Sequence, residues 1–148
     1  MIYTLSNILE ESVKSNPLGL SRILRASDKW SRYKLERSII VRLSDGSLLH
    51  IPKGFETDIS SVPRIFWAIL APDGDFALAA IIHDYLYVNK LFDRKFNDKE
   101  MLIWSKALYS TKRWSIHNID NYTRYYFVRL FGWTVWNKPK NPYKTDTI

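Results

Sequence analysis

The sequence contains no cysteine, which excludes a disulfide scaffold, zinc–thiolate sites, iron–sulfur clusters and a thiol nucleophile. Glycine is scarce as well, with 5 among 148 residues, and there is no glycine-rich phosphate loop. A zinc-binding H-E-x-x-H helix and a G-x-S-x-G nucleophile elbow are also missing. Several common catalytic frameworks are therefore excluded for this chain.

Long hydrophobic runs are missing too. The longest, residues 65–71 and 76–82, end well short of the roughly 20 apolar residues that a membrane-spanning helix needs. The first residues lack the basic and hydrophobic regions of a signal peptide. We therefore expect neither a signal peptide nor a transmembrane segment. Because 46% of the residues are nevertheless hydrophobic, the 148 residues can bury a proper core as one domain.

Charge is distributed unevenly along the chain. Residues 1–85 carry ten basic and ten acidic side chains, whereas residues 86–148 carry twelve basic and five acidic ones. The formal net charge of +7 therefore lies in the last 63 residues, and aromatic residues make up 15% of the chain. Such a basic, aromatic half suits an acidic protein, nucleic acid or an anionic membrane surface. The alternative is a solvated basic face over an aromatic core.

The N-terminal half predicts a β-hairpin preceded by short elements. Apolar spacing favours a helix over Leu5–Ser15, and Gly19–Lys29 suits either a second helix or a packed loop. The β-branched stretch Leu35–Leu43 and the return Ser47–Ile51 flank Asp45-Gly46, which is typical of a type I′ turn. The polar stretch 55–64 that follows is expected to be an ordered loop.

The C-terminal half predicts helices. Apolar residues at helical spacing indicate three of them: 75–89, from Asn97 or Asp98 to about Tyr109, and from Ile119 or Asn121 to Phe131. Gly132 is expected to stop the last one. The predicted fold is α+β, a short antiparallel sheet packed with three to five helices. We expect a helical extension over residues 1–32, the α+β domain over 33–136 and a surface tail over 137–148.

One helix carries the residues with the clearest chemistry. His83 and Asp84 are adjacent, so they face neighbouring directions, and Tyr87 shares the face of His83 at i+4. We expect at least one carboxylate, Asp98 or Asp58, within hydrogen-bond reach of the imidazole. Such a carboxylate fixes the tautomer and raises the basicity of the other ring nitrogen, which is the arrangement of a general base.

Other polar residues extend this hypothesis. Asp84 is a candidate ligand for a hard cation such as Ca²⁺ or Mg²⁺, and Ser61 is a weaker candidate nucleophile. Each residue also has a structural interpretation. His83 would be a hydrogen-bonded core residue, Asp98 a helix cap, Asp84 a cap or ion-pair partner, and Asp58 the residue that holds a turn.

Several short motifs follow one another along the chain: I-P-x-G-F-x-T-D-x-x-S-V-P-R at 51–64, A-A-x-x-H-D-Y-L-Y at 79–87, N-D at 97–98 and R-x-F-G-W at 129–133. This order resembles a family of bacteriophage and prophage domains of unknown function. The resemblance implies a phage origin, with the protein in the host cytoplasm during assembly and then in the phage particle. The chain departs from the family at Ile59-Ser60, where small residues are usual.

A second likeness is confined to four residues. H-D-x-x-Y on a helix, followed by an aspartate on the next helix, is similar to the calcium-dependent secreted phospholipase A2 arrangement. The similarity implies that His83 is a base, that Asp84 holds calcium, and that Tyr87 and Asp98 steady the histidine. The disulfides and the glycine-rich calcium loop of those enzymes are missing here.

Two functional hypotheses follow. The first is a virion-associated structural or accessory binding protein, in which the histidine and aspartates form a buried polar network. Its partners would be other phage proteins or a second copy, bound through Tyr125, Arg129, Trp133 and Trp136. Nucleic acid and membranes are less favoured. The alternative is a small metal-assisted hydrolase acting on lipid, cell-wall or nucleic-acid bonds. Because one helix stripe cannot bury all the C-terminal rings, we expect some to stay exposed.

Overall fold

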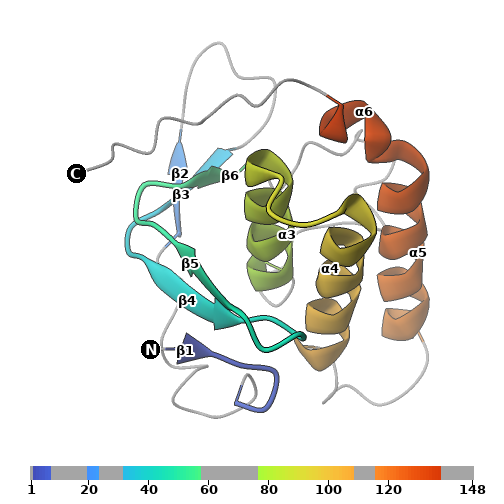
Figure 1. Cartoon of the computed structure of the whole chain (residues 1–148), viewed down its shortest axis with the longest axis horizontal. Coiled ribbons are helices and arrows are strands. Elements are labelled where there is room, and N and C mark those ends of the chain that lie inside the picture. The colour runs from blue at the N-terminus through green and yellow to red at the C-terminus, as the bar shows by residue number, and fades with distance from the viewer. Residues whose placement is uncertain (1, 8–19, 24–31, 58–76, 109–115, 138–148) are drawn as a thin grey trace.

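The computed structural model describes residues 2–7, 20–23, 32–57, 77–108 and 116–137, which form strands followed by helices (Figure 1). The strands are β1 (Ile2–Tyr3), β2 (Leu20–Ile23), β3 (Arg32–Leu35), β4 (Ile39–Arg42), β5 (Leu48–Ile51) and β6 (Glu56–Thr57). The helices are α3 (Ala77–Asn89), α4 (Arg94–Leu108), α5 (Ile116–Phe131) and α6 (Trp133–Trp136). The predicted α+β class is confirmed.

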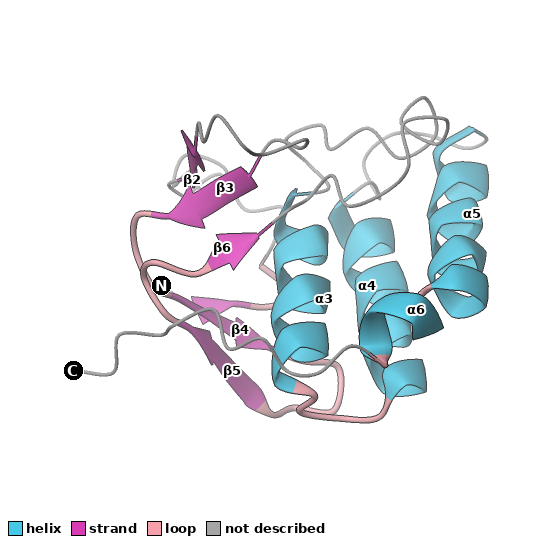
Figure 2. Ribbon diagram, turned by 90° about the horizontal axis from the view of Figure 1, so that it is seen from above, coloured by secondary structure: helices cyan, strands magenta, loops and turns pink. Residues whose placement is uncertain are grey.

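The described strands form two small sheets. In the first, β4 pairs with β5 in antiparallel and with β1 in parallel, in the order β1-β4-β5. The second is antiparallel, in the order β2-β3-β6. Figure 2 shows the strands on one side of a layer in which α3, α4 and α5 stand side by side, with α5 farthest from the sheets. None of the described helices is long and apolar enough to cross a membrane.

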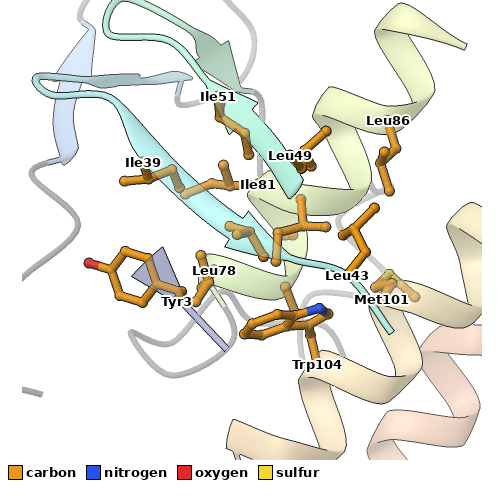
Figure 3. Packing of buried hydrophobic residues seen from close by; sticks show 14 of the residues in the cluster. Tyr3, Ile39, Leu43, Leu49, Ile51, Leu78, Ile81, Leu86, Met101 and Trp104 are labelled. Atoms are coloured by element: carbon orange, nitrogen blue, oxygen red, sulfur yellow. The ribbon is translucent and has the colours of Figure 1, made fainter. Parts of the chain in front are cut away.

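The hydrophobic core lies between the β4–β5 hairpin, α3 and α4 (Figure 3). Residues on the hairpin alternate between buried and exposed, as the two-residue period of a strand requires when one face meets a core. Helix α3 is buried along its whole first half, because strands and helix α4 both pack against it. Trp104 of α4 and Ile81 of α3 are fully buried in this cluster.

The hairpin is confirmed, but its details differ from the prediction. Residues 36–38 interrupt Leu35–Leu43, so β3 and β4 belong to different sheets. The turn is a three-residue loop rather than type I′. Gly46 has a positive φ of 87° and donates to the carbonyl of Leu43, whereas Asp45 lies outside the left-handed region. Asp45 instead accepts hydrogen bonds from the backbone and hydroxyl of Ser47, which closes the loop without a second left-handed residue.

The N-terminal expectations were wrong where the structure describes them. Leu5–Asn7 form a turn, closed by reciprocal hydrogen bonds between Thr4 and Asn7, rather than the start of a helix. Residues 20–23 form strand β2 rather than helix or loop, because β3 supplies an antiparallel partner. The remainder of both segments lies outside the described residues, as do 58–64 of the predicted loop, and the proposed domain boundaries stay a prediction.

The helices are confirmed with corrected starts. Helix α4 begins at Arg94, and its cap is Asp93, whose carboxylate accepts a hydrogen bond from the Phe96 amide at 2.8 Å. Neither Asn97 nor Asp98 is a cap, because both lie inside the helix and are fully buried. Helix α5 begins at Ile116 and ends before Gly132, as expected, although α6 follows at once.

A buried ionisable residue ties the hairpin to α4. Glu100 is fully buried, and its carboxylate accepts hydrogen bonds from the backbone amide of Ser44, at 3.2 and 3.3 Å, and from the Ser44 hydroxyl. A charge taken out of water is tolerated only when it is paired or hydrogen-bonded in this way. The contact therefore fixes the hairpin loop against the face of α4.

The core predicts a clear asymmetry between two apolar residues. We expect Ile81→Ala to lower the free energy of unfolding by about 2–5 kcal/mol, because it removes buried methyl groups and leaves a cavity. Leu48→Ala, at a position 57% exposed, should change it by less than about 0.5 kcal/mol. Urea unfolding followed by circular dichroism measures both. Equal losses for the two variants would contradict this placement of the core.

Candidate functional site

The candidate site is centred on His83, which the apolar helix α3 carries into the interior. His83 is 7% exposed, and its Nε2 lies 3.0 Å from Oδ1 of Asp98 on α4. The expected pairing of the imidazole with a carboxylate is therefore confirmed, with Asp98 as the partner. Because an ionised carboxylate can only accept, the Nε2–H donates to Asp98 and the lone pair of the neutral ring is on Nδ1.

Asp98 is held by two further donors from two other helices. The Tyr87 hydroxyl donates to the same Oδ1 at 2.5 Å, and Arg129 Nη1 of α5 donates to Oδ2 at 2.8 Å. Tyr87 reaches Asp98 because it lies one turn after His83 on the same face of α3, where their rings pack with centroids 4.1 Å apart. The fully buried carboxylate thus joins α3, α4 and α5.

Asp84 occupies the other side of the imidazole. Its Oδ2 accepts a hydrogen bond from the Thr57 hydroxyl of β6, and its Oδ1 lies 3.9 Å from His83 Nδ1, longer than a hydrogen bond. The side chain of Asp84 is 25% exposed, whereas that of Asp98 is sealed. The histidine therefore stands between a buried carboxylate on Nε2 and a partly solvated one near Nδ1.

The two carboxylates change the ionisation of the site. Burial alone would lower the pKa of His83, but the hydrogen bond to Asp98 and the negative charges of the nearby Asp84 and Asp98 outweigh it and raise that pKa above 6.5. Burial also favours neutral Asp98, yet hydrogen bonds from His83, Tyr87 and Arg129 hold its pKa below 3.8. Burial, reinforced by the charge of Asp98, raises the pKa of Tyr87, so this hydroxyl stays protonated and donates.

The end of α5 and helix α6 hold Tyr87 and Arg129 in place. Arg94 donates to the carbonyls of Val128 and Arg129, at 3.2 and 3.1 Å, and so satisfies the last turn of α5. Trp136 packs edge-on against Tyr87, with the centres of the two rings 5.1 Å apart. A Cβ at Gly132 would lie 2.9 Å from the Tyr87 hydroxyl and 2.3 Å from the Val128 carbonyl. Only glycine therefore allows this close approach.

Four of the residues proposed from the sequence lie together: His83, Asp84, Tyr87 and Asp98. Asp58 and Ser61 lie outside the described residues. Two members of the network were missed, Thr57 and Arg129. Thr57 immediately precedes Asp58 in the T-D motif, but the sequence does not show that Thr57 belongs to strand β6, which pairs with β3. Arg129 was assigned to a partner-binding surface, because helical spacing does not show which side chain reaches another helix.

A cation site is the least supported part of the hypothesis. Within the described ranges there is no group of three or more histidine, aspartate or glutamate side chains that could hold a metal ion. Among the described residues, the partly exposed carboxylate near His83 Nδ1 is that of Asp84, and its Oδ2 already accepts the Thr57 hydrogen bond. The role of Asp84 as a Ca²⁺ or Mg²⁺ ligand therefore stays a prediction.

The class of protein defined by this geometry is a small α+β domain with a histidine–aspartate network shared by three helices. Residues 33–118 match the family model described as DUF1353, protein of unknown function. The chain belongs to this family. The matched span includes His83, Tyr87 and Asp98, whereas Arg129 and α6 follow it. No curated protein and no solved structure matches the chain.

The network predicts a specific pH dependence of stability. A raised His83 pKa stabilises the fold fully below the unfolded value of about 6.5, and this contribution is lost as the pH rises through the folded pKa. The lowered Asp98 pKa stabilises above about 3.8 and is lost as the pH falls through its folded value.

We therefore expect the free energy of unfolding to decrease as the pH is raised from about 6 to about 9, and to decrease less in a His83→Gln variant. Urea unfolding at a series of pH values measures both slopes. Parallel slopes for the wild-type chain and the variant would show that His83 is not the responsible group.

Proposed function

We propose that the protein is a hydrolase in which His83 is the general base. The observation that carries this proposal is the asymmetric environment of the imidazole. Nε2 is fixed by the sealed Asp98, while Nδ1 is directed toward the partly exposed Asp84 at 3.9 Å. A purely structural histidine needs no such difference between its two sides, whereas a base needs one nitrogen anchored and the other available to water.

The proposed reaction needs only groups already in the site and one water molecule. Nδ1 of neutral His83 takes a proton from water as the water oxygen attacks the carbonyl or phosphoryl centre of an ester. The imidazolium that forms is stabilised by Asp98 through Nε2–H and then gives its new proton to the departing oxygen. The ester bond breaks, an acid and an alcohol are released, and His83 is neutral again.

Tyr87, Arg129 and Thr57 have positioning roles in this proposal. Tyr87 donates to Oδ1 of Asp98 and Arg129 donates to Oδ2, so the carboxylate cannot rotate its Oδ1 away from the imidazole. Thr57 holds Asp84, the partly exposed carboxylate near Nδ1 of the ring. Because the pKa of His83 is raised, the basic form that accepts a proton dominates only above that pKa. Activity should therefore increase with pH above the value of an ordinary histidine.

The test uses p-nitrophenyl acetate for carboxylic esters and bis(p-nitrophenyl) phosphate for phosphodiesters, each with and without Ca²⁺ or Mg²⁺. We expect the wild-type chain to hydrolyse one of them, and Asp98→Asn and His83→Gln to lower kcat by about 10²–10⁴-fold. In Asp98→Asn the acidic limb of the pH profile should also move to lower pH, because the imidazolium loses its counter-ion.

Ser44→Ala is the matched control for stability, because it removes a hydrogen bond to the other buried carboxylate of α4, Glu100. It should lower the free energy of unfolding while leaving kcat unchanged. Hydrolysis of neither ester above the rate of His83→Gln would overturn the proposal. So would equal losses of kcat in Ser44→Ala and Asp98→Asn, since the effect would then follow stability alone.

A second candidate is an accessory binding protein of a bacteriophage, in which the network only fixes the fold. The sequence resemblance supports the phage origin, and the observation that favours binding is an exposed apolar face on α5 and α6. This face is defined by Tyr122, Tyr126, Leu130, Phe131, Trp133 and Val135, which are 42–65% exposed. The expectation that some C-terminal rings stay exposed is thus confirmed.

The binding role predicts where the chain is found in cells that produce phage. After prophage induction of the bacterium that encodes it, we expect the chain in the particle fraction or with host membranes. Immunoblots of particles, membranes and supernatant, separated on density gradients, measure the distribution. Recovery of the chain only in the supernatant, before and after induction, would contradict this role.

A further inference from the structure

The exposed apolar face runs as one stripe along α5 and into α6. Tyr122, Tyr126 and Leu130 follow at spacings of four residues, which places them on one side of α5, and the exposed Trp133 follows at the start of α6. Figure 2 shows α5 as the outermost helix of the layer, and the side chains of this face are 42–65% exposed. Large apolar groups that are gathered in this way mark an interaction surface.

A basic stripe runs beside it on α4. Lys95, Lys99 and Lys106 are exposed and are spaced by four and seven residues, so they also share one helical side. Lys106 Nζ lies 3.2 Å from the Tyr122 hydroxyl and 5.2 Å from the centre of its ring. This contact joins the basic stripe of α4 to the apolar stripe of α5 in one continuous surface.

Among the described side chains near this surface, the exposed negative charge is that of Asp93, the cap that precedes α4. The two acidic side chains of α4, Asp98 and Glu100, are both fully buried. Residues 121–137 contain arginines but neither aspartate nor glutamate. Across α4 and residues 121–137, every exposed charged side chain is therefore a lysine. The partner that complements such a surface is anionic and accepts large apolar groups.

We propose that this face docks on the surface of an anionic lipid bilayer. Tyrosine and tryptophan rings prefer the headgroup level of a membrane, and phenylalanine and leucine reach below it, while lysines meet anionic headgroups. The face provides each of these groups, with Leu130 and Phe131 between Tyr126 and Trp133 in the sequence. The inference rests on the binding role proposed above and is independent of the hydrolytic site.

Other occupants fit the surface less well. A second copy that docked face to face would bring two lysine stripes of like charge together, which is unfavourable. Nucleic acid would use the rings as stacking platforms, but Leu130 and Val135 have no aromatic face to offer. An acidic protein is the main competitor, and a face that binds only such a protein would leave both kinds of vesicle unbound in the experiment below.

The experiment is co-sedimentation of the full chain with vesicles of phosphatidylcholine alone or with one third phosphatidylglycerol. We expect binding to the anionic vesicles only, and weaker binding as NaCl is added. Changing Lys95, Lys99 and Lys106 to Gln together should weaken it on the order of a hundredfold. The Leu130→Ser/Phe131→Ser double variant should also lose binding, because it removes the groups that enter the bilayer.

Two exposed residues near the sheets provide matched controls. Lys53→Gln and Leu48→Ser remove an exposed lysine and an exposed leucine outside the α4–α6 surface, so both should bind like the wild-type chain. Equal binding to neutral and anionic vesicles, or binding to neither, would overturn the proposal. Dimerisation in analytical ultracentrifugation without vesicle binding would assign the face to a second copy. Ester hydrolysis in solution is measured separately, so failure of one proposal does not imply failure of the other.

Discussion

The rest of the structure depends on one buried carboxylate, that of Asp98. A charge taken out of water destabilises a protein unless donors surround it, and Asp98 is fully buried. Its three donors come from His83 and Tyr87 on α3 and from Arg129 on α5. Satisfying that charge therefore requires α3, α4 and α5 to stand at one relative position. The anchoring of α5 by Arg94 and the close approach at Gly132 serve the same requirement.

The same requirement makes the two sides of His83 different. Asp98 is sealed and accepts three hydrogen bonds, whereas Asp84 is partly solvated and is held by Thr57. Two carboxylates in unlike environments give the two ring nitrogens unlike surroundings, which is the feature that the proposed acid–base chemistry uses. The buried position of Asp98 and Glu100 also leaves the outer side of α4 to lysines alone. The burial of these two carboxylates therefore accounts for both the polar interior and the basic surface of α4.

Local patterns predicted much of the fold and part of the site. The hairpin, the last residues of α3 and α5, and the shared face of His83 and Tyr87 were all predicted correctly. These features depend on short-range patterns, such as spacings of two or four residues, that the sequence displays directly. The start of α4 was placed too late, because Asp98 resembles a cap in sequence but is needed in the interior. Strand β2 was not predicted because a strand is stabilised by its pairing partner. The residues 20–23 by themselves do not indicate that β3 is that partner.

The sequence by itself determined the α+β class, the helical face that carries the histidine, and an excess of C-terminal rings and positive charge. It also restricted the partner of His83 to Asp98 or Asp58. Only the tertiary structure decided that Asp98 is a partner of His83, that Arg129 points inward, and that α5 lies outermost with its rings exposed. The physical reason is that periodicity defines the faces of a helix, whereas the partner of each face is set by packing between segments far apart in the chain.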